Sequence, residues 1–126
     1  MLKLALYVVA GLYLSTGIYM FVAPQAFYDG TPGVAMMGPF NTHFIRDAGL
    51  AFLVSGGALV WGGLNRNQAV AVFGAIWPCL HALFHVWLWV ARGVPFDLVA
   101  LVNWGGIQLP AWLALVAAWN LKGQDG

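Results

Sequence analysis

The sequence predicts an all-α fold, an integral membrane bundle of four helices. Hydrophobic residues make up 62% of the 126 residues and charged residues only 7%, which is too apolar for a soluble domain of this length. Four nearly uncharged stretches, each about 20 residues or longer, are long enough to span a bilayer. Polar or Gly- and Pro-containing turns separate them. We therefore expect one domain that covers residues 1–126.

The first helix is expected at about residues 2–22, where Pro24 ends it. Lys3 followed by an apolar run is also typical of a signal peptide. However, a run of about 20 residues is longer than the hydrophobic region of most signal peptides, and no good A-x-A cleavage site follows. We therefore expect a retained transmembrane helix. The long connection at 23–41 is apolar between its Gly and Pro turn signals, which favours a loop on the membrane surface or over the mouth of the bundle.

Starts, ends and internal prolines define the other helices. Asn41 or Thr42 is a good N-cap for the second helix. Pro78 is expected to kink the third helix near Gly74, and Pro110 the fourth, because proline removes a backbone hydrogen bond. The expected ranges are 42–63, 68–92 and 97–120.

The positive-inside rule orients the helices. With four spans, the side that holds both termini carries Lys3, Arg66 and Lys122. The other side carries Arg46 and Arg92, close to three Asp residues. This bias predicts that both termini lie in the cytoplasm.

Composition also bears on partners and chemistry. Five scattered Lys and Arg residues and a net charge of +1 give no basic patch, so no nucleic-acid partner is expected. The lone Cys79 excludes an intrachain disulfide or a CxxC pair. Nuclease, kinase, hydrolase and Rossmann signatures are absent, and the sequence predicts no catalytic residue.

A polar cluster stands directly before the apolar run of the second helix. His43, Arg46 and Asp47 are spaced i, i+3, i+4, so they share one helical face at the outer end. Two further histidines, His81 and His85, share a face of the third helix. Other polar groups are expected at similar depth, and together these residues predict one polar site under the 23–41 loop, with Asp47 facing the two histidines. Those other groups are Asn103 and Tyr19.

Several chemical roles fit this cluster. His81 and His85 at i, i+4 are well spaced to bind one ion, and His43 with Asp47 would complete a Zn, Cu or Fe site. A single b-type haem would instead use histidines from two helices, such as His43 and His85. A proton relay or a quinone contact is a further alternative for the two deeper histidines.

Other roles involve lipid, substrate or the protein itself. Arg46 is suited to hold an anionic headgroup or a substrate carboxylate, with Asn103 and Tyr19 as further contacts. Alternatively, His43 and its neighbours are interfacial residues that pair with headgroups or nearby charges. In the same way, His81 and His85 would only hydrogen-bond neighbouring helices.

Residues of the long loop and the second helix resemble a group of uncharacterised bacterial four-helix membrane proteins of the broad DoxX-like type. The resemblance covers roughly the first half of the chain, and with it we expect the protein to lie in a bacterial inner membrane. It implies the four-helix architecture and implies that the loop and the His43 cluster form one unit; it names no activity. The residues that carry it are Phe27-Tyr28-Asp29 with Pro32-Gly33, then Phe40-Asn41-x-His43-Phe44-x-Arg46-Asp47-x-Gly49.

Three functional hypotheses follow. The first is a non-catalytic accessory or structural subunit of a larger membrane complex, which fits the small size and the helices rich in Gly and Trp. The second is a metal- or haem-binding redox protein, or one that interacts with quinone, through the histidines. The third is a small-molecule or lipid-binding protein or transporter that uses Arg46. The expected partners are membrane lipids and either other membrane subunits or further copies of the chain.

Overall fold

The computed structural model describes residues 1–121, and that part of the chain is helical without a strand. Four helices are long and apolar enough to cross a membrane, the last of them the continuous stretch Leu98–Trp119. The protein is therefore an all-α integral membrane bundle of four helices, as the sequence predicts. In chain order the elements are α1 (Leu2–Val22), α2 (Pro24–Gly30), η1 (Val34–Met37), α3 (Thr42–Leu64), α4 (Gln68–Ala91), α5 (Leu98–Val102), η2 (Asn103–Gln108) and α6 (Leu109–Trp119).

The spanning helices begin and end within one residue of their predicted bounds. The larger difference is the connection at 23–41, which is not a plain loop because it contains α2 and η1. Pro24 occupies the first turn of α2, where its missing N–H is not needed. Lys122, which the orientation argument uses, lies outside the described residues.

Side-chain caps mark the starts of three helices. Asn41 Oδ1 accepts a hydrogen bond from Phe44 N at 3.0 Å, and Asn67 Oδ1 accepts one from Val70 N at 3.1 Å. Asp97 Oδ1 accepts one from Ala100 N at 2.8 Å. Each cap satisfies a backbone N–H that has no partner within its helix. The caps explain why α3, α4 and α5 begin where they do.

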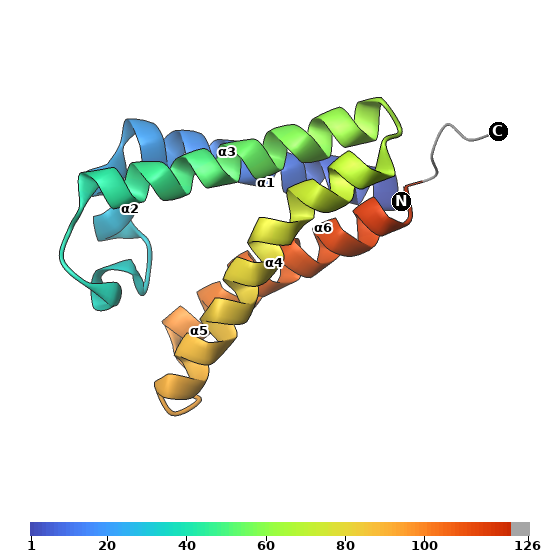
Figure 1. Ribbon diagram of the computed structural model, residues 1–126. Coiled ribbons are helices and arrows are strands. Elements are labelled where there is room, and N and C mark those ends of the chain that lie inside the picture. The colour runs from blue at the N-terminus through green and yellow to red at the C-terminus, as the bar shows by residue number, and fades with distance from the viewer. Residues whose placement is uncertain (122–126) are drawn as a thin grey trace.

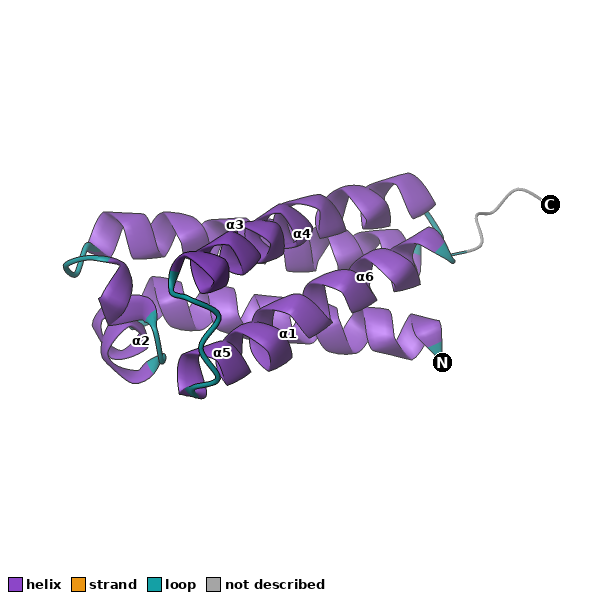
Figure 2. Cartoon of the chain, turned by 90° about the horizontal axis from the view of Figure 1, so that it is seen from below, coloured by secondary structure: helices purple, strands orange, loops and turns teal. Residues whose placement is uncertain are grey.

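The helices form two pairs that separate toward one end of the bundle. Figure 1 shows α1 lying beside α3, and α4 beside α6, with the two pairs meeting at one end and diverging at the other. We call the closed end, with Leu2, the turn at 65–67 and Leu121, the terminal end. The diverging end, with the 23–41 connection and the turn at 92–97, is the loop end. In the view from below in Figure 2, the axes of the four spanning helices are nearly aligned, and consecutive spanning helices run in opposite directions.

The shared hydrophobic core lies in the terminal half. It draws on all four spanning helices and includes Leu6, Tyr13 and Leu59. A second, smaller cluster closer to the loop end consists of Cys79, Ala82 and Ala111, which belong only to α4 and α6. The two pairs therefore share a core at one end and pack separately toward the other.

Glycine produces the close contact between α1 and α3. A Cβ added at Gly17 would lie 2.6 Å from the Gly49 carbonyl oxygen, and one at Gly56 would lie 2.8 Å from Leu14 Cγ. Gly63 faces Tyr7 in the same way. Gly49, Gly56 and Gly63 recur every seven residues, so they form one seam along α3 at which the backbones approach closely.

The two internal prolines have different effects on their helices. The third spanning helix, α4, stays α-helical through Pro78, and the kink expected near Gly74 stays a prediction. In the fourth, the π-helical turn η2 directly precedes Pro110, whose ring nitrogen has no hydrogen for the carbonyl of Gly106. The wider turn accommodates this irregularity, as π-bulges do inside α-helices.

An ion pair between Arg92 and Asp97 closes the turn between α4 and α5 at the loop end. Its hydrogen bond from Arg92, followed by that from Ala100 N, lowers the pKa of the Asp97 carboxyl below its ordinary value. A carboxyl whose pKa is lower in the folded state than in the unfolded state stabilises the fold at neutral pH. For Asp97 this stabilisation is lost as the pH falls from the ordinary pKa of 3.8 through the lower folded-state pKa.

We expect detergent-purified protein to lose thermal stability as the pH falls below 3.8, with part of the loss arising from Asp97. Asp97→Asn keeps an N-cap side chain but does not titrate, so its melting temperature should fall less over the same range. Asp29→Asn is the control, because Asp29 bonds only to Gln25 on the exposed side of α2. Identical pH profiles for wild type and Asp97→Asn would contradict the assignment.

Candidate functional site

The polar cluster at the start of α3 is exposed at the loop end. His43 Nε2 lies 3.2 Å from Asp47 Oδ2, and the two side chains are 87% and 58% exposed. The predicted i, i+4 proximity is therefore present. The sequence predicts that Asp47 faces His81 and His85, and this prediction is wrong. Asp47 lies beside His43 at the surface instead. The reason is the rotation of α3, which turns Ile45 and Gly49 to the protein interior instead.

Arg46 connects this cluster to α1. Its Nε donates a hydrogen bond to the Phe21 carbonyl oxygen at 3.0 Å, and its guanidinium lies 5.5 Å from the centroid of the Phe21 ring. Phe21 is in the last turn of α1, where carbonyls have no partner within the helix and a cation is favourable. Arg46 thus stabilises the end of α1; its use as an anion contact stays a prediction.

Tyr19 lies against the loop segment, away from the α4 histidines. Its ring packs edge-on against Phe27 of α2, with centroids 5.8 Å apart. Next to it, Tyr28 Oη donates to the Gly38 carbonyl oxygen at 2.8 Å, and the Tyr28 ring packs on Phe40. These contacts fold the 23–41 segment on itself and hold it at the end of α1 and α3.

His81 and His85 lie together on α4, near the point where the helix pairs diverge. Their ring centroids are 4.5 Å apart, and the His81 ring stacks on Trp77 at 5.0 Å. Phe52 of α3 packs edge-on against His81 at 6.0 Å. Both histidines are partly buried, and neither ring forms a hydrogen bond within residues 1–121. They present polar nitrogens in an aromatic setting at membrane depth.

A buried hydroxyl lies close to these histidines. Tyr13 packs on Phe52 with centroids 5.5 Å apart, and its Oη is buried without a hydrogen-bond partner among the described residues. The cavity between the helix pairs here has a volume of about 10 Å³, the space of a single water. Tyr13 was not predicted as a site residue, because one hydroxyl in an apolar helix is an ordinary pattern. The cavity lining is Tyr13, Phe52, Pro78, His81, Gly106 and Ile107.

Asn103 belongs to a separate, buried network between α4, η2 and α6. Gln108 Nε2 donates to the Ala82 carbonyl oxygen at 2.6 Å and to Asn103 Oδ1 at 3.0 Å. Trp112 Nε1 donates to Gln108 Oε1 at 3.1 Å. Asn103 and Gln108 are five residues apart, and the π-helical turn brings them onto one face. A helix of 3.6 residues per turn gives no reason to expect this pairing, so sequence reasoning missed the role of Gln108.

The single polar site expected from sequence is therefore not assembled. His43 with Asp47, His81 with His85, and Asn103 with Gln108 form three separate pairs. Within the described residues, no three His, Cys, Asp or Glu side chains are placed to hold one metal ion. The predicted Zn, Cu or Fe site of four ligands is thus not formed by this chain alone.

The four spanning helices define a small multi-pass membrane protein, and two of its histidines, His81 and His85, are partly buried. No protein-family model, curated protein or solved structure matches the chain. The resemblance of the 23–49 segment to bacterial four-helix membrane proteins therefore stays an expectation from the sequence.

Proposed function

We propose that this chain is a non-catalytic subunit of a larger membrane complex, in a bacterial inner membrane with both termini in the cytoplasm. The observation that carries the proposal is the position of His81 and His85. His81 faces Phe52 of α3 across the region where the helix pairs separate, and His85 lies beside it on α4. Neither has a hydrogen-bond partner in residues 1–121. Polar groups at membrane depth normally have a partner or a task, and a neighbouring subunit would supply it.

The uncovered helices nearby support this proposal. Toward the loop end, α5 packs on η2, and its Val99 side chain lies against Gly33 of the 23–41 connection. It makes no comparable contact with α1 or α3 (Figure 1). Phe84 and Trp87 beside the histidines are mutually stacked and exposed. A Cβ added at Gly105 would meet no atom within 4 Å, and one at Gly106 would meet only Val102 Cγ1, at 3.9 Å. Small residues with open space around them allow close approach of a membrane helix.

The cavity volume favours a protein partner over a resident cofactor. About 10 Å³ next to His81 accommodates one water, whereas haem or a quinone ring needs several hundred Å³. Two histidine nitrogens also leave a metal ion short of the three or four protein ligands that stable sites use. A cofactor would thus require the helix pairs to move apart or a second chain to add ligands.

Photocrosslinking in intact cells tests the proposal. A photoreactive residue replaces Phe84, and a matched one replaces Phe73, which is eleven residues earlier on the same face of α4 in the terminal half. Both positions are exposed, at 50% and 72%. We expect one discrete protein adduct from position 84, which disappears when His81 and His85 are both changed to Ala, and mainly lipid adducts from position 73.

Two results would contradict the proposal. Lipid adducts alone from both positions would indicate that no subunit covers the histidines. A stoichiometric metal or a haem absorption band in the purified protein, lost in the His81→Ala variant but not in His43→Ala, would favour the redox hypothesis instead.

A further inference from the structure

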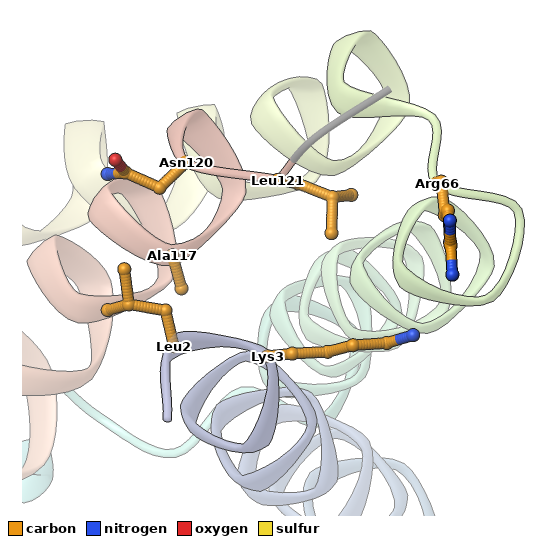
Figure 3. Close-up of a pocket in the computed structure, with 6 residues that line it drawn as sticks. All are labelled: Leu2, Lys3, Arg66, Ala117, Asn120 and Leu121. Carbon is orange, nitrogen blue, oxygen red and sulfur yellow. The ribbon is translucent and has the colours of Figure 1, made fainter. Parts of the chain in front are cut away.

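The terminal end contains a pocket that none of the predicted functions uses. Its volume is about 320 Å³, and it lies between the start of α1, the turn at 65–67 and the end of α6 (Figure 3). We propose that it binds the phosphate group of an anionic phospholipid. The lining is Leu2, Lys3, Arg66, Ala117, Asn120 and Leu121.

Two cations from different elements converge on this pocket. Figure 3 shows the Lys3 side chain extending from the first turn of α1 in the direction of the Arg66 guanidinium. Arg66 holds a left-handed backbone conformation, with φ of 51°, which is unfavourable for a residue other than glycine. The Asn67 N–H, which donates to the Gly62 carbonyl oxygen at 2.8 Å, holds the turn in this shape. The fold thus maintains an unfavourable backbone conformation at the residue that faces Lys3.

No acidic side chain of residues 1–121 balances these cations. The three described aspartates, Asp29, Asp47 and Asp97, all lie toward the loop end. Within the same residues, neither Lys3 nor Arg66 forms a salt bridge. Backbone N–H groups in the first turn of α1 add partial positive charge beside Lys3. The pocket is therefore electropositive and suited to an anion.

The opposing helix end does not cancel this charge. The carbonyls at the end of α6 carry partial negative charge, but side chains already bond two of them. Gln68 Nε2 donates to the Trp119 carbonyl oxygen, and Asn120 Nδ2 donates to the Val116 carbonyl oxygen at 2.8 Å. Two of the carbonyls that face Lys3 and Arg66 are therefore already hydrogen-bonded, and the positive charge of the pocket is not cancelled.

The apolar wall favours a lipid over a free anion. Leu2, Ala117 and Leu121 line the same pocket as the two cations, so one side suits acyl chains and the other a phosphate. Trp61 and Trp119 are exposed near this end, and tryptophan is enriched at the headgroup level of membranes. A diacyl phosphate fits both the depth and the amphipathic lining.

The test measures lipid binding by native mass spectrometry on delipidated protein in detergent, with phosphatidylglycerol and phosphatidylcholine as probes. We expect tighter binding of phosphatidylglycerol. Lys3→Gln and Arg66→Gln should each weaken it roughly fivefold, and the double variant roughly thirtyfold, at about 1 kcal/mol per charge near an anionic headgroup. Binding of phosphatidylcholine should not change.

Controls separate a lost site from a lost fold. The charge-preserving variant Lys3→Arg with Arg66→Lys should retain selectivity, as should Arg92→Gln, which removes a charge at the loop end. Helical circular dichroism and monodisperse elution confirm that the double Gln variant folds. The proposal is overturned if that variant keeps its affinity for phosphatidylglycerol, or if millimolar inorganic phosphate occupies the site and displaces the lipid.

Discussion

Gly17→Val is expected to destabilise the protein by about 3 kcal/mol, because it forces apart the tightest contact between α1 and α3. A Cβ at this position would lie 2.6 Å from the Gly49 carbonyl oxygen and 2.8 Å from Leu53 Cγ. The first of these neighbours is backbone, which has no rotamer into which it can move. The helices must therefore separate and lose packing along the seam. Equilibrium unfolding of the purified protein in mixed micelles of mild detergent and SDS measures the change.

Gly11→Val is the matched control for this prediction. It lies in the same helix, and a Cβ there meets no atom within 4 Å. The same substitution should then change the free energy of unfolding by only about 0.5 kcal/mol, the usual effect at an open surface. Equal losses from Gly11→Val and Gly17→Val would show that helix propensity, rather than the α1–α3 contact, controls the result.

Gln108→Leu is expected to cost about 2–3 kcal/mol, because three hydrogen bonds are lost and their partners remain in apolar surroundings. Gln108 bonds to the Ala82 carbonyl, to Asn103 and to the Trp112 indole N–H. The Asn103 amide nitrogen is already buried without a hydrogen-bond partner. The removal of Gln108 would also leave the Asn103 amide oxygen without one. The same unfolding measurement in mixed micelles reports the loss.

A second substitution tests whether the cost comes from the stranded partner. Asn103→Leu combined with Gln108→Leu removes both polar groups, and we expect a smaller loss, about 1 kcal/mol. Ser15→Ala is the control, because its hydroxyl is exposed and bonds only within its own helix, to the Leu12 carbonyl at 2.9 Å. If the double variant is less stable than Gln108→Leu, the network does not act in this way.

The polar residues show where sequence reasoning is limited in this protein. The i, i+4 rule correctly places His43 beside Asp47 and His81 beside His85, since neighbours within one helix follow from helical geometry. The same rule says nothing about the rotation of one helix relative to another. That rotation leaves Asp47 at the surface and places the His81 ring against Phe52, so the predicted common site does not form.

The sequence alone determined the class of this protein, its four spanning helices and their bounds. These depend on local properties: runs of apolar residues, capping side chains and turn residues. Only the tertiary structure decided that the helix pairs share a core at the terminal end and diverge at the loop end. It also decided that Lys3 and Arg66 line one pocket and that Gln108 joins Asn103. Such contacts depend on glycine seams and on a π-helical turn, whose effect on helix rotation and spacing appears only when the helices pack.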